Sequence, residues 1–166
     1  MVRKILAATL CLFLFVPLQA CHHNNTTGNT VKIYYRNLEP DYTSLHSSGV
    51  ISAEEIKVSD TLTNVELILN QYLCKPKDKL HVSPYPDGTT LTEVYIQDNM
   101  AYVTMSAEFS TLSGKDMTVA CVCLTLTVIS ATQTQSVTIT APGLNISGND
   151  SITLDKSCIQ LFDDVT

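Results

Sequence analysis

The sequence predicts a single α/β domain of the α+β sandwich kind. Its elements follow the order β-α-β-β-α-β, with two helices on one face of a small mixed sheet. A β-branched and aromatic segment, Val31–Arg36, is typical of a strand. Apolar residues at helical spacing predict a helix at Leu62–Cys74. Two apolar runs, Leu91–Gln97 and Met100–Met105, flank a short polar turn and predict a hairpin. A chain of 166 residues, 45% of them hydrophobic, suits one core.

A long polar connection, Asn37–Ser59, follows the first strand and has room for a short strand near Ile56–Val58. In the helix after it, apolar residues recur along one face: Leu62, Val65, Leu69 and Leu73. Pro76 then ends the helix, because the residue before a proline disfavours helical backbone angles. Next, Ser83–Thr89 holds two prolines and an Asp-Gly pair. This pattern indicates a rigid turn, which either binds a ligand or only directs the chain into the next strand.

The hairpin has a register that the sequence predicts. Asp98-Asn99 is a two-residue polar turn, so Gln97 pairs with Met100 and Tyr95 lies opposite Tyr102. The other face is then small and aliphatic, with two further pairs: Val94 with Val103, and Ile96 with Ala101. The two tyrosines are either a candidate interaction surface or a plain cross-strand contact on a solvated face.

The segment Met117–Ala131 fits more than one element. Its apolar residues form two stripes at helical spacings, whereas its many threonines favour a strand. No charged residue occurs between Asp116 and Asp150. Because exposed surface rarely runs so far without charge, we expect this stretch to be buried or to face a partner.

The C-terminal part is predicted to consist of strands. Val137–Ala141 alternates between apolar and polar residues, and Pro142-Gly143 ends it. Two further segments, Ser151–Leu154 and Cys158–Phe162, predict one or two short strands.

The first residues read as an export signal. The apolar run Ile5–Leu18 follows Arg3-Lys4 and is shorter than the roughly 20 residues that a membrane-spanning helix needs. It ends in Leu18-Gln19-Ala20-Cys21, which resembles a lipobox, the site at which a cysteine is lipidated and becomes the new N-terminus. The alternative is an ordinary signal peptide with a chance cysteine.

The chain is predicted to have three parts, the first of which is removed by cleavage before Cys21. Residues 1–20 form the lipoprotein signal peptide, 21–30 a polar tether, and 31–166 the folded domain. Each buried methylene contributes about 0.8 kcal/mol, so the two or more acyl chains on Cys21 would hold the domain at the membrane. The predicted location is the extracytoplasmic side of the cell membrane.

The remaining cysteines are predicted to be buried free thiols, although export would also permit a disulfide. The set comprises Cys74, Cys121, Cys123 and Cys158. Cys121 and Cys123 are too close in sequence for an easy internal bridge. The histidines are scattered or lie in the tether, so neither a metal nor another cofactor is expected.

Charge excludes nucleic acid as a partner. The chain has 10 basic and 16 acidic residues, a net charge of −6, and loss of Arg3 and Lys4 with the signal would bring this to −8. Nucleic-acid binding needs clustered Lys and Arg, and no basic stripe is present.

Four segments stand in a characteristic order. They are Val31–Tyr35, Pro86–Leu91, Met100–Phe109, and Leu124–Thr127 continuing through Val137–Ile139 to Pro142-Gly143. Behind a lipobox, this set resembles the GerMN domain, the sporulation and spore germination domain of bacterial lipoproteins. The resemblance implies a helix at Met117–Ala131 and a fold like that of ring-building oligomerisation modules. The chain departs from the family in its many threonines and in its Cys121/Cys123 pair. It also has one such domain, whereas the best-known spore-germination members have two.

The resemblance and the leader together predict a non-catalytic, membrane-anchored interaction or scaffold domain in a cell-envelope or sporulation- and germination-related assembly. Its partner would be another protein or a second copy of itself, and its candidate residues are Cys21, Tyr95 and Tyr102. The first alternative is a small-ligand-binding lipoprotein, with a pocket lined by Tyr85, Tyr95 or Tyr102. The second is a cell-wall hydrolase. The sequence speaks against it, because the two histidines of the folded part, His46 and His81, lie in no recognisable catalytic motif.

Overall fold

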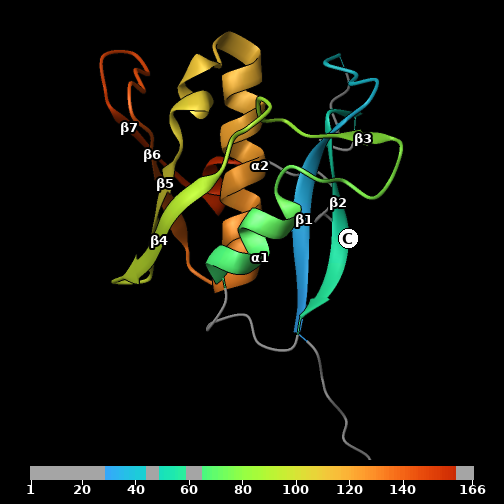
Figure 1. Ribbon diagram of the computed structural model, residues 1–166, viewed down its shortest axis with the longest axis horizontal. Coiled ribbons are helices and arrows are strands. Elements are labelled where there is room, and N and C mark those ends of the chain that lie inside the picture. The colour runs from blue at the N-terminus through green and yellow to red at the C-terminus, as the bar shows by residue number, and fades with distance from the viewer. Residues whose placement is uncertain (1–28, 44–48, 59–64, 160–166) are drawn as a thin grey trace, which may run out of the picture.

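A computed structural model describes residues 29–43, 49–58 and 65–159, and in this part of the chain two sheets lie on either side of one long helix (Figure 1). The strands are β1 (Asn29–Asn37), β2 (Ile51–Val58), β3 (His81–Val82), β4 (Leu91–Gln97), β5 (Met100–Met105), β6 (Ser136–Thr140) and β7 (Ser151–Asp155). The helices are α1 (Val65–Tyr72) and α2 (Gly114–Thr132), with short 3-10 helices η2 (Ala107–Thr111) and η3 (Lys156–Cys158).

Sheet B has the strand order β4-β5-β6-β7, with a register shift between Leu91 and Glu93 of β4. Its strands are antiparallel except for β5 and β6, which run parallel because α2 connects them. Buried and half-buried residues alternate along β5 and β6. The buried set on these two strands is Ala101, Val103, Met105, Val137 and Ile139. One face of sheet B is therefore core and the other is turned to solvent.

Sheet A has the order β2-β1-β3 and is antiparallel throughout. Val31, Ile33 and Tyr35 of β1 are buried in the main core together with Leu69 of α1. The hydroxyl of Tyr35 also donates a hydrogen bond to the carbonyl of Tyr72, at the end of α1. The end of α1 is thereby tied to β1, while Asn70 of α1 exchanges two hydrogen bonds with the backbone of Leu91 in β4.

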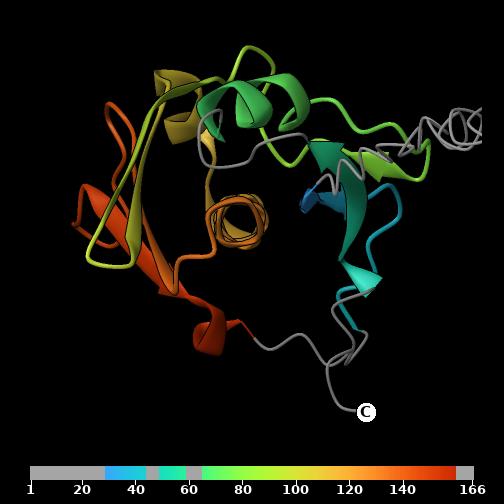
Figure 2. The same ribbon diagram turned by 90° about the horizontal axis from the view of Figure 1, so that it is seen from below.

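Helix α2 lies between the sheets, as the view along its axis shows (Figure 2). It buries apolar residues on nearly all sides, with Ala120, Leu124 and Val128 fully inside. Length and composition alone would allow α2 to cross a membrane, but 61% of that segment is buried inside the fold. It therefore serves as the core helix here.

Hydroxyl groups of α2 take the place of a neighbouring strand along β1. The N–H of Tyr34 donates to Thr127 Oγ1 at 2.9 Å, and the N–H of Lys32 donates to Ser130 Oγ at 2.8 Å. Because backbone donors need partners, these two side chains allow β1 to lie against a helix. Two hydroxyls of α2 therefore have a structural role at the edge of β1.

The predicted fold class and most predicted elements are confirmed. The first strand, the helix before Pro76, the hairpin, the Met117–Ala131 helix and the two strands after it are all present. The hairpin register is also the predicted one, with Tyr95 opposite Tyr102 and Gln97 opposite Met100. Residues 1–28, 59–64 and 160–166, which include the predicted lipobox and the start of the first helix, lie outside the described residues.

Three features differ from the sequence analysis. The strands divide between two sheets rather than one, since α2 occupies the edge of β1. The short strand expected near Ile56–Val58 is the end of the eight-residue strand β2, and β3 was not predicted. Cys158 ends a 3-10 helix rather than beginning a strand, because Asp155 accepts hydrogen bonds from the N–H groups of Ser157 and Cys158.

Candidate functional site

The predicted tyrosine pair lies on the solvent-facing side of sheet B. The rings of Tyr95 and Tyr102 are stacked, with centroids 4.8 Å apart and planes 7° apart. Tyr95 is 47% exposed, and Tyr102 is half-buried. Ile96, on the predicted aliphatic face, is also 46% exposed, which indicates that the end of the hairpin extends beyond the core. The pair is therefore a preformed aromatic feature of the surface.

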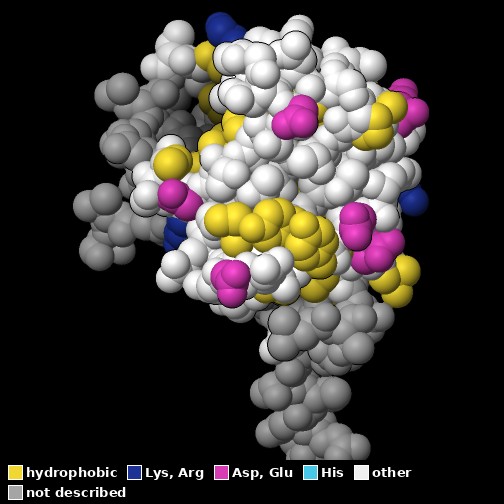
Figure 3. Space-filling model, turned by 90° about the vertical axis from the view of Figure 1, so that its left-hand side faces the viewer, with side chains coloured by type: hydrophobic (Ala, Val, Ile, Leu, Met, Phe, Trp, Pro, Cys, Tyr) yellow, Lys and Arg dark blue, Asp and Glu magenta, His cyan; other side chains and the backbone are white. Residues whose placement is uncertain are grey.

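Mostly uncharged residues surround this pair, and one acidic residue, Glu93 of β4, lies opposite Thr104 on the same face. The outward positions of β5 and β6 are Met100, Thr104, Ser136, Thr138 and Thr140. Cross-strand bonds tie the hydroxyls together: Thr138 Oγ1 lies 2.9 Å from Thr153 Oγ1, and Thr140 donates to Thr104 at 3.2 Å. In Figure 3 this face shows one gathered hydrophobic patch within largely uncharged surface, with acidic side chains at its margin. We call it the sheet B outer face.

The cysteines are free in the described part of the chain. Cys121 and Cys123 are buried, and burial raises the pKa of Cys121 to about 11 and that of Cys123 further. Such thiols stay protonated and unreactive at neutral pH. Cys74 is half-buried and Cys158 is exposed. No group of three or more metal-ligating side chains occurs among the described residues.

A polar cluster that the sequence did not predict lies at one end of sheet A. Ser52 Oγ is 2.6 Å from His81 Nε2, and His81 Nδ1 is 2.9 Å from Glu54 Oε1. Asn37 Oδ1 also accepts a hydrogen bond from Ser52, at 2.5 Å. We call these four residues the Ser52 cluster. They come together because Asn37 pairs with His81 across β1 and β3, while Ser52 and Glu54 share one face of β2.

Glu54 is the anchored member of this cluster. Burial by itself would raise the pKa of Glu54, but hydrogen bonds from the backbone N–H of Asp78 and the side chain of His81 outweigh it and lower the pKa. The backbone N–H of Lys77 donates to the same carboxylate at 3.0 Å. The side chains of His81 and Glu54 are only 11% and 12% exposed. The cluster thus holds an ionised carboxylate against an imidazole.

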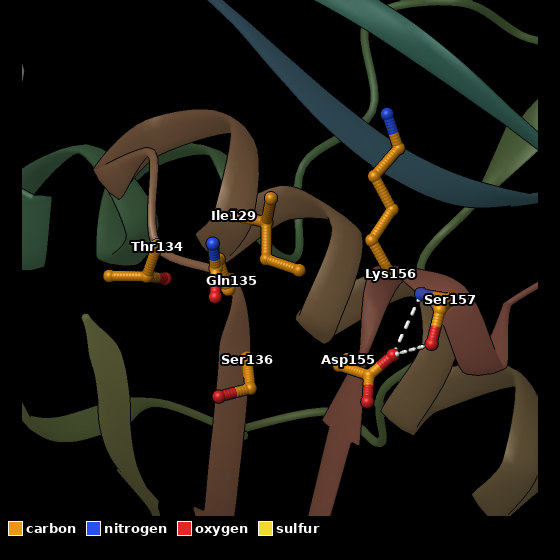
Figure 4. A pocket seen from close by; sticks show the side chains of 7 residues that line it. All are labelled: Ile129, Thr134, Gln135, Ser136, Asp155, Lys156 and Ser157. Carbon is orange, nitrogen blue, oxygen red and sulfur yellow. Dashed lines mark hydrogen bonds between the residues drawn. The ribbon is translucent and has the colours of Figure 1, made fainter. Parts of the chain in front are cut away.

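Two hollows lie near these features. One, of about 410 Å³, is lined by Ser52 and His81 together with Asn37, Leu38, Glu39 and Leu80. The other, of about 510 Å³, is lined by Ile129, Thr134, Gln135, Ser136, Asp155, Lys156 and Ser157 (Figure 4). In the second hollow Asp155 is already bonded to Ser157, so its polar groups do not converge on a free centre. Tyr85, Tyr95 and Tyr102 line neither hollow, and Tyr85 is itself buried.

Comparison with known proteins identifies the family. Residues 32–146 match the family model Germane, described as sporulation and spore germination. The chain belongs to this family. The GerMN resemblance is therefore confirmed, and the matched segment runs from β1 to just beyond β6. Residue Cys21 lies outside the match, so its lipidation stays a prediction.

One solved structure shows the same fold. The first GerMN domain of the sporulation protein GerM from Bacillus subtilis has 16% identity and a TM-score of 0.57, over 77% of this chain and 98% of that one. A Clostridium perfringens protein described as a lipoprotein has 16% identity and a TM-score of 0.47, over 77% of this chain and 87% of that one. No match was found among curated proteins. At 16% identity, the likeness to the GerM domain concerns the fold alone.

The two candidate surfaces differ in how the sequence signals them. Tyr95 and Tyr102 follow from the two-residue turn, because the turn sets the register. The Ser52 cluster had only a weak signal, the Ser-Ala-Glu spacing that puts Ser52 and Glu54 on one strand face. Its third member, His81, lies in a two-residue strand that no pattern marks.

Proposed function

We propose that this Germane-family protein is a lipid-anchored, extracytoplasmic interaction domain in a cell-envelope or sporulation- and germination-related assembly. The family match supports a role in a cell-envelope or sporulation- and germination-related assembly. The leader ending at Cys21 supports the lipid anchor and the extracytoplasmic location. Tethering at the membrane raises the local concentration of a partner and so allows a modest surface to bind effectively.

The observation that carries the interaction role is the sheet B outer face. It presents, among mostly uncharged side chains, a stacked pair of tyrosines whose rings are already ordered. Aromatic side chains are enriched at the centres of protein interfaces, because they bury a large area and lose little conformational entropy. Its occupant in this proposal is a protein partner, either another protein of the assembly or a second copy of this chain.

The anchor is tested by metabolic labelling with radioactive palmitate in cells that express either the wild type or Cys21→Ala. Label should enter the wild type and be absent from the variant, which should also leave the detergent phase on phase separation. Equal labelling of both proteins would contradict the anchor.

The surface is tested by crosslinking in intact cells followed by mass spectrometry. The double variant Tyr95→Ala, Tyr102→Ala should lose the crosslinked species, whereas Tyr42→Ala should keep it. Tyr42 is a matched control, since it is 45% exposed but lies outside sheet B. A crosslinked species that contains only this chain would indicate self-association. One that survives the double variant unchanged would contradict the proposed surface.

A further inference from the structure

We propose that the Ser52 cluster is a nucleophilic triad that cleaves neutral esters of small acyl groups. Ser52 would be the nucleophile, His81 the general base and Glu54 the residue that orients the base. This activity is independent of the membrane anchor and of the sheet B outer face.

The geometry meets the requirements of nucleophilic catalysis. A serine hydroxyl becomes nucleophilic when a base lies within about 2.6–3.2 Å and a third group orients that base. Ser52 Oγ lies 2.6 Å from His81 Nε2, and Glu54 Oε1 lies 2.9 Å from His81 Nδ1. Since Glu54 is ionised, it accepts the proton on Nδ1 and leaves Nε2 free to take the proton of Ser52.

Glu54 is held more firmly than a surface carboxylate. Its oxygens accept the backbone N–H groups of Lys77 and Asp78 as well as His81. The two backbone bonds explain a structural role for Glu54, which holds the turn before β3. That role does not need His81 to lie between Glu54 and Ser52. The position of His81 between a carboxylate and a serine is therefore the feature that indicates catalysis.

Asn37 is the second partner of Ser52. In the structure its Oδ1 accepts from Ser52 Oγ at 2.5 Å. For attack, the Ser52 hydroxyl turns its proton from Asn37 Oδ1 to His81 Nε2, which lies 2.6 Å from the same oxygen. Asn37 thus holds the hydroxyl in place until a substrate is bound.

The reaction balances with water as the second reactant. Ser52 Oγ forms a bond to the ester carbonyl carbon while its proton passes to His81 Nε2. The bond from that carbon to the alcohol oxygen then breaks, and the alcohol leaves with the proton from Nε2. Water attacks the acylated Ser52 and gives one proton to His81. The acid departs, and that proton returns to Ser52 Oγ.

The hollow beside Ser52 indicates the substrate class. Its volume is about 410 Å³, and Leu38 and Leu80, which are 54% and 68% exposed, supply apolar walls. Small pockets with apolar walls accept short hydrocarbon groups. Glu39 lines the same hollow and Glu54 lies behind it, so an anionic ester would be repelled. A neutral ester such as an O-acetyl or O-butyryl group fits these features.

The test uses the full chain, purified in detergent, with a fluorophosphonate probe and with 4-nitrophenyl acetate. The probe should add once, and peptide mass spectrometry should place it on Ser52. Ester turnover should fall at least about 100-fold in Ser52→Ala and in His81→Gln. Glu54→Gln should lower kcat with little change in KM, because it orients the base without touching the substrate.

The control is Ser110→Ala, which removes a half-buried serine hydroxyl bonded to a carbonyl oxygen rather than to a base. It should react with the probe and the ester as the wild type does. Mapping the adduct on the wild type needs no variant, so a variant that fails to fold cannot obscure the result. No adduct on Ser52, or turnover that Ser52→Ala retains, would overturn the proposal. Labelling of Ser52 in Cys21→Ala would show that it stands apart from the anchor.

Discussion

The two sheets of this domain provide hydrogen-bond partners for the backbone of their inner strands in different ways. In sheet B, β5 and β6 each have a strand on both sides, and their side chains alternate between the core and solvent. In sheet A, β1 has β2 on one side but α2 along much of the other, where Thr127 and Ser130 accept its N–H groups. An exposed row of N–H groups invites pairing with another chain, so a helix bearing hydroxyls protects that edge.

This difference separates the roles of the two sheets. The outer face of sheet B is mostly uncharged and open to solvent, which suits docking. Sheet A is drawn into the core through β1 and collects its polar side chains at one end, which suits a small site. The proposed binding face thus lies on one sheet and the proposed chemical centre on the other.

Helix α2 should be the common support of both sheets. Leu124 is fully buried between them, so Leu124→Ala should lower the free energy of unfolding by about 2–5 kcal/mol. Leu67→Ala, at a residue 64% exposed on α1, should change it by less than about 0.5 kcal/mol. Urea denaturation measures both values. Hydrogen exchange should show both sheets losing protection together in Leu124→Ala, and loss from one sheet alone would break the comparison.

The free energy of unfolding should depend on pH through Glu54, at the end of sheet A. Glu54→Gln should lower the free energy of unfolding by about 1.5–3 kcal/mol at neutral pH, because it weakens hydrogen bonds to a charged group. The pKa of Glu54 is lowered on folding from its usual value of 4.5. Its contribution is therefore complete above about pH 4.5 and is lost as the pH falls through the lower folded value. Unfolding measured from pH 3 to pH 7 should show the wild type and the variant converging in acid.

Glu55→Gln is the control for that experiment. Glu55 is the exposed neighbour on β2, and its substitution should leave the pH profile within about 0.5 kcal/mol of the wild type. A constant difference between the wild type and Glu54→Gln across the whole pH range would contradict the role given to the Glu54 carboxylate.

The contact between β1 and α2 should contribute less to the free energy of unfolding than Leu124 or Glu54, and its loss should be detected at one amide. Thr127→Val removes the buried acceptor of the Tyr34 N–H and should lower the free energy of unfolding by about 1–2 kcal/mol. Ser130→Ala, at an exposed bond, should have a smaller effect because water replaces the hydroxyl. The exchange rate of the Tyr34 amide should rise in the first variant only. An unchanged rate would mean that Thr127 does not protect this edge.

The smallest expected effect on stability is at the tyrosine pair. A double-mutant cycle of Tyr95→Ala and Tyr102→Ala should give a coupling energy below about 1 kcal/mol, as for other cross-strand pairs. Thermal unfolding of the four proteins measures it. A coupling well above about 2 kcal/mol would assign the pair to folding rather than to binding.

Sheet B is the sheet that the sequence predicted in detail. Asp98 and Asn99 both adopt positive φ angles, 50° and 62°, as a two-residue hairpin turn requires, and the turn fixes the register of β4 and β5. The stacking of Tyr95 on Tyr102 follows from that register. Local chemistry was therefore enough to predict this candidate surface.

Sheet A resisted prediction because its burial is set by tertiary contacts. Ser52 and Glu54 of β2 face the core side but are polar, since they bond to His81, which comes 29 and 27 residues later. β3 is only two residues long and carries no periodicity. The Ser52 cluster exists only once three strands have been assembled, so no local pattern could reveal it.

The contrast between the two sheets is tested most directly by photocrosslinking in intact cells. A photoreactive amino acid replaces either Thr153, exposed on sheet B, or Ala53, exposed on β2 of sheet A. The account predicts a discrete crosslinked partner or dimer from position 153, abolished by Tyr95→Ala with Tyr102→Ala, and none from position 53. A crosslink from position 53 alone, or equal crosslinking from both positions, would contradict it.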